Sequence, residues 1–106
     1  MVVILWEFEV KSGSEERFQR AYGPEGAWVQ LFRRDPYFQG TQLLPDPSRP
    51  HYYFTLDFWD SENAYHAFLD RNREAYEELD RSSEGLTLRQ RRILSFTLSL
   101  PLSPGP

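Results

Sequence analysis

The residues best suited to chemistry lie in one segment, His51–Phe68, which reads HYYFTLDFWDSENAYHAF. Asp57 can exchange a proton, and the nearby rings of Trp59 and Tyr65 can hold a planar molecule. A carboxylate beside aromatic rings costs free energy to bury unless it is paired, so two interpretations of Asp57 stay open. It forms a salt bridge to an arginine such as Arg92, or it acts as an acid or base in a pocket.

The same segment alternates like a β-strand as far as Trp59 and has helical spacing after Ser61. One side of the alternation holds only large apolar residues: Tyr52, Phe54, Leu56 and Phe58. The other side mixes rings with polar groups: Tyr53, Thr55, Asp57 and Trp59. We predict that the first side is buried in the core. We expect the Trp59 end of the second side to border an aromatic pocket, although a buried Trp also serves simply for packing.

Further residues are candidates for binding a substrate in this pocket: Trp6, Tyr22, Trp28, Tyr53, Phe68 and Asn72. Tyr22 and Trp28 flank Gly23-Pro24, which interrupts a helix and forms either a pocket mouth or a packing kink. Asn72 lies on the apolar arc of the following helix, as either a hydrogen-bonding strut or a pocket group.

The elements that position these residues follow from hydrophobic periodicity and from capping and turn residues. Alternation predicts four strands: Val2–Val10, Tyr37–Leu44, His51–Trp59 and Ile93–Leu100. A helix broken at Gly23-Pro24 is expected between the first two strands, and one long helix from Ser61 to Gly85 between the last two. Gly40 predicts a β-bulge, and Glu7 is expected near a solvated strand end.

This order of elements predicts an α+β, ferredoxin-like βαββαβ fold with a four-stranded antiparallel sheet. Two helical units cover only one face of such a sheet, yet the first strand presents Val3 and Leu5 opposite Ile4 and Trp6. Both faces therefore need cover, which predicts a homodimer with two sheets face to face. We expect one domain over residues 1–100 and a flexible, Pro-rich tail over residues 101–106.

Composition removes several classes of function. The chain has 106 residues, and 12 Lys and Arg against 16 Asp and Glu give a net charge of −4, which disfavours binding to nucleic acid. No cysteine and only two histidines make a metal site improbable. Without a membrane span or a signal peptide in the sequence, a cytoplasmic protein with no membrane partner is expected.

Two features resemble the small antibiotic biosynthesis monooxygenase (ABM) domains of the dimeric α+β barrel superfamily. They are the break Tyr22-Gly23-Pro24-x-Gly26-x-Trp28 and the strand-to-helix junction Asp57-x-Trp59-x-Ser61. The resemblance covers residues 2 to 98, including LWEFEVKSGSEERFQRAYGPEGAWVQLFRRDPYFQGTQLL, YFTLDFWDSENAYHAF and YEELDRSSEGLT. It implies the ferredoxin-like fold and a dimeric α+β barrel.

The resemblance also implies a function: a cofactor-independent monooxygenase, or a related isomerase, acting on a small planar phenolic or quinol compound. One branch of the superfamily places a Trp and a Tyr where this chain has Trp59 and Tyr65, and an Asn where it has Thr55. Asp57, Trp59 and Tyr65 are therefore the expected catalytic residues, with no metal, flavin or heme. The alternative is a non-catalytic homodimer that binds a small hydrophobic molecule or serves in assembly.

Overall fold

The computed structural model of the protein describes residues 1–99. The predicted tail at 101–106, and residue 100 of the predicted domain, lie outside the described residues. In chain order the elements are β1 (Val2–Val10), α1 (Glu15–Tyr22), α2 (Ala27–Phe32), β2 (Phe38–Pro45), β3 (Tyr52–Trp59), α3 (Glu62–Arg71), α4 (Arg73–Ser83), the 3-10 helix η1 (Glu84–Leu86) and β4 (Thr87–Thr97). No helix within residues 1–99 is long and apolar enough to cross a membrane.

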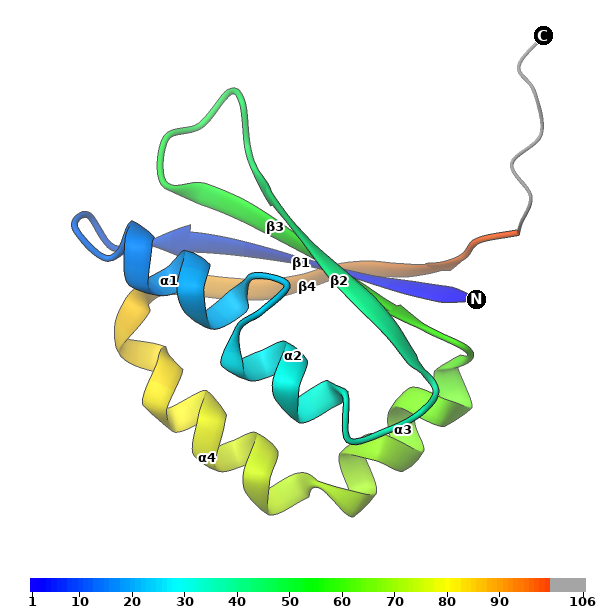
Figure 1. The fold of residues 1–106 in the computed structure, drawn as a ribbon. Coiled ribbons are helices and arrows are strands. Elements are labelled where there is room, and N and C mark those ends of the chain that lie inside the picture. Colours follow the sequence, from blue (N-terminus) through cyan, green and yellow to red (C-terminus); the bar gives the residue numbers. More distant parts are fainter. Residues whose placement is uncertain (100–106) are drawn as a thin grey trace, which may run out of the picture.

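The four strands form one antiparallel sheet in the order β2-β3-β1-β4, which confirms the predicted ferredoxin-like α+β fold. All the helices lie on one face of this sheet, and the other face is uncovered (Figure 1). On the covered face, Ile4 and Phe8 of β1 pack into the core with Phe18 of α1 and Phe68 of α3. Burial of these side chains is the main stabilising contribution to a domain of this size.

The prediction that the Tyr52 side of β3 is the side buried in the core is wrong. Thr55, Asp57 and Trp59 face the helices and are 4%, 7% and 0% exposed. The apolar side, with Tyr52, Phe54, Leu56 and Phe58, lies on the uncovered face and is only half-buried. The prediction took the more apolar side as the buried one, whereas burial in this chain depends on which face the helices cover.

The predicted long helix is in fact two helices, α3 and α4, which meet at Asn72. The backbone of Asn72 leaves the helical region, with φ −122° and ψ 25°, and its side-chain amide donates a hydrogen bond to the Phe68 carbonyl at 3.0 Å. Asn72 is thus a hydrogen-bonding strut at a bend. Ser61 caps α3 as predicted, because its hydroxyl accepts a hydrogen bond from the Ala64 amide at 3.1 Å.

The strand bounds differ from the prediction mainly at the end of the chain. β4 begins at Thr87, well before the predicted start at Ile93, and so brings Gln90 and Arg92 beside β1. The predicted bulge in β2 is confirmed: the register with β3 shifts between Phe38 and Gly40, where φ is 135°. Such a backbone angle favours glycine.

Glu7 is buried rather than solvated, so this expectation was wrong. It lies on the uncovered face, where its carboxylate accepts hydrogen bonds from Arg49 at 2.6 Å and from Arg91 at 3.0 Å. Arg49 also pairs with Asp46 at 2.8 Å. These two guanidinium groups lower the pKa of Glu7 and keep it ionised. A charged cluster therefore lies on the same uncovered face as the apolar side of β3.

Candidate functional site

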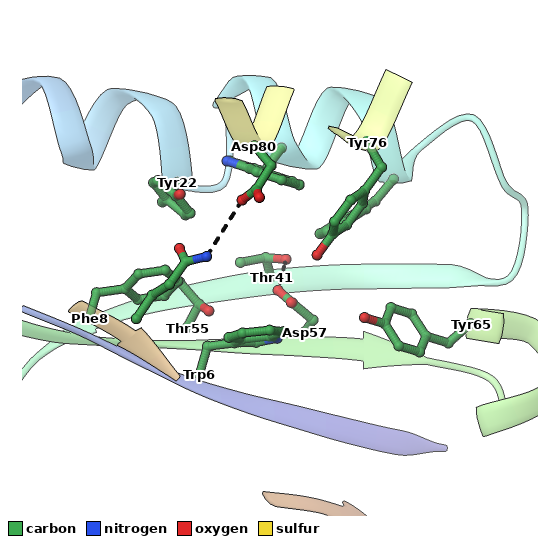
Figure 2. Close-up of a pocket in the computed structure, with 12 residues that line it drawn as sticks. Trp6, Phe8, Tyr22, Thr41, Thr55, Asp57, Tyr65, Tyr76 and Asp80 are labelled. Carbon is green, nitrogen blue, oxygen red and sulfur yellow. Dashed lines mark hydrogen bonds between the residues drawn. The ribbon is translucent and has the colours of Figure 1, made fainter. Parts of the chain in front are cut away.

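A cavity lies between the covered face of the sheet and the helices (Figure 2). Most of its lining is aromatic and comes from β1, α1, α2, α3 and α4: Trp6, Phe8, Tyr22, Trp28, Phe32, Tyr65 and Tyr76. Its polar groups come from β2, β3, β4 and α4: Thr41, Thr55, Asp57, Gln90 and Asp80. Many rings with a few convergent polar groups are typical of a small-molecule site.

The cavity is narrow. Only about 40 Å³ of it is wide enough to admit the centre of a water molecule. Since one buried water needs roughly 10–15 Å³ by that measure, the space holds a few waters. A planar ring system enters only if side chains around the cavity move.

The break between α1 and α2 places two rings of the lining. Gly26 begins α2 against the end of α1, and a Cβ on it would lie 2.3 Å from the Ala21 carbonyl oxygen. This close approach brings the ring of Tyr22, at the end of α1, within 5.8 Å of the ring of Trp28 in α2. The Gly-Pro break thus forms part of the cavity wall.

Asp57 lies on the floor of the cavity, in the middle of β3. Its cross-strand neighbours are Ile4 and Thr41, and the Thr41 hydroxyl donates a hydrogen bond to its carboxyl at 2.8 Å. The salt bridge considered for Asp57 does not form, because Arg92 pairs with Glu62 at 3.0 Å. Burial without a cationic partner raises the pKa of Asp57 to about 7. The group can therefore both accept and release a proton near neutral pH.

Three tyrosines surround the space above Asp57. The phenolic oxygens of Tyr65 and Tyr76 point toward this carboxyl (Figure 2). Burial raises the pKa of both phenols, and it raises the pKa of Tyr22 to about 12. All three phenols are consequently neutral at physiological pH and available as hydrogen-bond donors.

Asp80 of α4 lies opposite the floor (Figure 2), and Gln90 joins the lining from β4 of the sheet. The Gln90 amide donates a long hydrogen bond of 3.5 Å to the Asp80 carboxylate, which links the helix to the sheet. A single bond of this length is weak. This polar contact is a place where the cavity wall can open at small cost.

Five of the nine residues predicted for the site line this one cavity: Trp6, Tyr22, Trp28, Asp57 and Tyr65. The other four lie outside its lining. Trp59 and Phe68 are fully buried in the core, Asn72 is at the α3–α4 bend, and Tyr53 contacts Phe18 at a ring distance of 5.3 Å.

Sequence reasoning did not assign seven residues of the lining to the site: Phe8, Phe32, Thr41, Thr55, Tyr76, Asp80 and Gln90. Tyr76 and Asp80 are four residues apart and so share one face of α4, a spacing that could have identified them. Thr41 becomes a neighbour of Asp57 only through the β2–β3 register. Within residues 1–99, no three His, Asp or Glu side chains are grouped so that they could hold a metal ion.

The comparisons with known proteins agree with this architecture. The sequence model of one protein family, described as antibiotic biosynthesis monooxygenase, matches residues 1–79. The structure of SnoaB from Streptomyces nogalater, described as a cofactor-independent oxygenase, is similar with a TM-score of 0.67 and 20% sequence identity. The match covers 95% of this chain and 97% of SnoaB.

A structure from Deinococcus radiodurans, described provisionally as an antibiotic biosynthesis monooxygenase, has a TM-score of 0.74 at 12% identity. The match covers 100% of both chains. A comparison with curated proteins gives no match. At these identities the structural similarities establish the fold, and a fold of this kind can carry different reactions.

Proposed function

Because the chain belongs to the antibiotic biosynthesis monooxygenase family, we propose that it oxidises a planar phenol or quinol with molecular oxygen, without a bound cofactor. The observation that carries the proposal is the buried carboxyl of Asp57, which faces the aromatic cavity and has a pKa of about 7. A group with such a pKa can remove a proton from a substrate and later return it.

The first step is removal of the phenolic proton by Asp57. Thr41 holds one carboxyl oxygen at 2.8 Å and so fixes the orientation of the group. The neutral phenols of Tyr65 and Tyr76 point to the same space and can donate hydrogen bonds to the substrate oxygen as its negative charge develops. In a buried site, such fixed donors stabilise an anion more effectively than they would in water.

The electrons for oxygen reduction come from the substrate anion. It transfers one electron to O₂, and the resulting radical and superoxide combine at the ring carbon para to the oxygen. A proton converts this adduct to a hydroperoxide. Loss of water, with the ring hydrogen leaving as a proton, gives the quinone. A phenol with a free para carbon plus O₂ thus gives a quinone plus water, which balances without another reductant. Asp57 can supply a proton to the peroxide.

Access requires movement of the cavity wall. The Asp80–Gln90 hydrogen bond of 3.5 Å is the polar contact across the side opposite Asp57. We propose that it separates when a substrate enters between α4 and β4. Displacement of the few waters that the cavity holds by an aromatic ring would favour binding.

We also propose that the functional unit is a homodimer. The uncovered face presents Leu44, Leu94 and Phe96, which are 42%, 46% and 42% exposed, beside the half-buried Leu56 and Phe58 of β3. Contiguous exposed apolar residues on one sheet face are typical of an association surface. A second copy of the same face, related by a twofold axis, would cover it.

The test is oxygen uptake with a panel of naphthols, anthrols and quinols, together with ligand binding measured by tryptophan fluorescence. Asp57→Asn keeps the shape of the side chain but cannot accept the proton, so turnover should fall roughly a hundredfold or more while binding persists. Asp70→Asn, at an exposed site on α3, is the matched control and should leave turnover unchanged.

Two results would contradict the proposal. Binding without oxygen uptake by the wild-type protein would favour the non-catalytic, ligand-binding dimer. Equal turnover in Asp57→Asn and wild type would remove Asp57 from the mechanism.

A further inference from the structure

The lining of the cavity that we propose as the active site contains acidic side chains but no basic ones. Two carboxylates, Asp57 and Asp80, line it, and none of its lining residues is Lys, Arg or His. The remaining polar groups are two Thr hydroxyls, three Tyr hydroxyls, the indole groups and the Gln90 amide. An anionic group entering this space would find hydrogen-bond donors but no opposite charge within the lining.

Two of the three arginines of β4 are already paired, and the third, Arg89, lies opposite Glu9 in the β1–β4 register. Arg92 lies beside the cavity wall, with its guanidinium carbon 6.0 Å from the centre of the Tyr65 ring, and it is bound to Glu62 at 3.0 Å. Arg91 is bound to Glu7 on the opposite face of the sheet. Using either arginine for an anionic ligand would require breaking an ion pair, which offsets the gain.

The two carboxylates have few partners. Asp57 is 7% exposed, and within residues 1–99 its one side-chain hydrogen bond comes from Thr41. Asp80 forms no ion pair within those residues, and its one side-chain contact is the 3.5 Å bond from Gln90. Both groups therefore retain free acceptor capacity toward the cavity. The faces of the surrounding aromatic rings carry partial negative charge, which also attracts cations.

From this arrangement we infer that the site selects planar phenols that carry no negative charge, and binds most tightly those that also carry a protonated amine. The inference rests on the proposed function, because it concerns the same cavity. Asp57 comes from β3 on the floor, and Asp80 comes from α4 on the opposite side (Figure 2). A ring system with a phenol at one end and an amine at the other would meet both carboxylates.

Specificity against carboxylated phenols follows from the same groups. A carboxylate placed near Asp80 suffers repulsion between like charges in a partly buried space, where water screens them poorly. A protonated amine at that position gains both an ion pair and contact with the surrounding rings. Discrimination between ligands of one shape therefore comes from attraction and repulsion at the same carboxylate.

The experiment compares three ligands of one ring system: 2-naphthol, an aminomethyl-2-naphthol and a hydroxynaphthoic acid. Dissociation constants are measured by tryptophan fluorescence at pH 7 and low salt, in the absence of oxygen so that no turnover intervenes. We expect the amine to bind about tenfold more tightly than 2-naphthol, and the acid at least about tenfold more weakly.

Asp80→Asn isolates the residue responsible. It should remove most of the advantage of the amine over 2-naphthol and relieve part of the penalty on the acid. Glu77→Gln removes the same charge from an exposed position of α4 and serves as the matched control. It should leave the order of the three ligands unchanged, because exposed charges are well screened.

The inference is overturned if the acid binds as tightly as 2-naphthol, if Asp80→Asn and Glu77→Gln shift the ligand order equally, or if none of the three ligands binds. It is supported if the amine binds best and only Asp80→Asn removes that preference. Its failure is distinguishable from failure of the proposed function. Charge-selective binding with no oxygen uptake supports the inference and rejects the monooxygenase.

Discussion

Asp57 makes folding stability depend on pH. In the unfolded chain its carboxyl has the ordinary pKa of 3.8, whereas burial raises the pKa to about 7 in the folded protein. Between these values the folded protein keeps a proton that the unfolded chain has released. Raising the pH therefore favours the unfolded chain. The contribution of Asp57 falls by about 1.4 kcal/mol per pH unit across this window and is constant above pH 7.

We predict that Asp57→Asn is more stable than wild type at pH 8, and that this advantage shrinks as the pH falls to 5. The amide cannot ionise, but its oxygen can still accept the hydrogen bond from Thr41. Urea unfolding of both proteins at each pH measures the difference in unfolding free energy. A difference that is the same at pH 5 and pH 8 would contradict the raised pKa.

Trp59 contributes to the core rather than to the cavity lining. Its side chain is fully buried, and its ring lies 5.1–5.6 Å from those of Phe32, Phe38, Tyr65 and Phe68. Removing such a ring loses buried area and leaves a void among the neighbouring rings.

We predict that Trp59→Ala lowers the unfolding free energy by about 3–5 kcal/mol. Tyr37→Ala, which removes a half-exposed ring, is the control and should change it by less than about 0.5 kcal/mol. Urea unfolding monitored by circular dichroism provides the measurement. If Trp59→Ala retained wild-type stability and lost only ligand binding, Trp59 would belong to the site instead.

At the scale of elements, the start of α3 fixes the position of Tyr65. The Ser61 hydroxyl accepts the Ala64 amide at 3.1 Å, and Tyr65 follows one residue later. The hydroxyl of Ser14, the N-cap of α1, accepts no hydrogen bond from a helix amide and is instead bound by the Arg17 guanidinium at 3.2 Å. The two serines therefore occupy equivalent positions with different hydrogen bonding.

We predict that Ser61→Ala destabilises the protein by about 1 kcal/mol, because an amide at the start of α3 loses its acceptor. Ser61→Thr keeps a hydroxyl at the cap and should cost less. Thermal unfolding of both variants gives the comparison. Equal losses would show that the capping bond contributes little.

Much of the fold was predictable because several of its elements have a local signal in the sequence. The alternation of β1, the cap at Ser61 and the bulge at Gly40 each have a local cause, so sequence alone identified them. The bend at Asn72 was not predictable, because the apolar spacing continues through it from α3 into α4. The sequence also did not reveal which side of β3 the helices cover, because both sides of this strand carry large rings.

The site was predictable only in part, for the same physical reason. Asp57 and Tyr65 are close in sequence, and the strand-to-helix junction brings them together. Asp80 and Gln90 meet only when α4 packs over β4, a contact that no local pattern specifies. Their contribution to the cavity depends on tertiary packing.

For the whole molecule, the uncovered sheet face decides the expected assembly. Leu94 is 46% exposed in the protomer, so a change there alters the surface and leaves the core intact. We predict that the protein is a dimer and that Leu94→Arg shifts it to a monomer while retaining its helical content. Sedimentation velocity at micromolar concentration and circular dichroism measure the two properties.

Tyr37→Arg is the matched control, since Tyr37 is 52% exposed but precedes β2 and lies outside this face. It should remain a dimer. A wild-type protein that sediments as a monomer would remove the dimer from the proposal.

The strand order has a consequence for synthesis. β1 occupies an inner position of the sheet and precedes both of its neighbours, β3 and β4, in the chain, and β4 follows α4. While the ribosome is still translating α4, one edge of β1 has no partner and can pair with another nascent chain. The complete sheet forms only once β4 has emerged. We therefore expect this sheet to be most prone to wrong pairing, and most in need of a chaperone, in the interval before β4 is made.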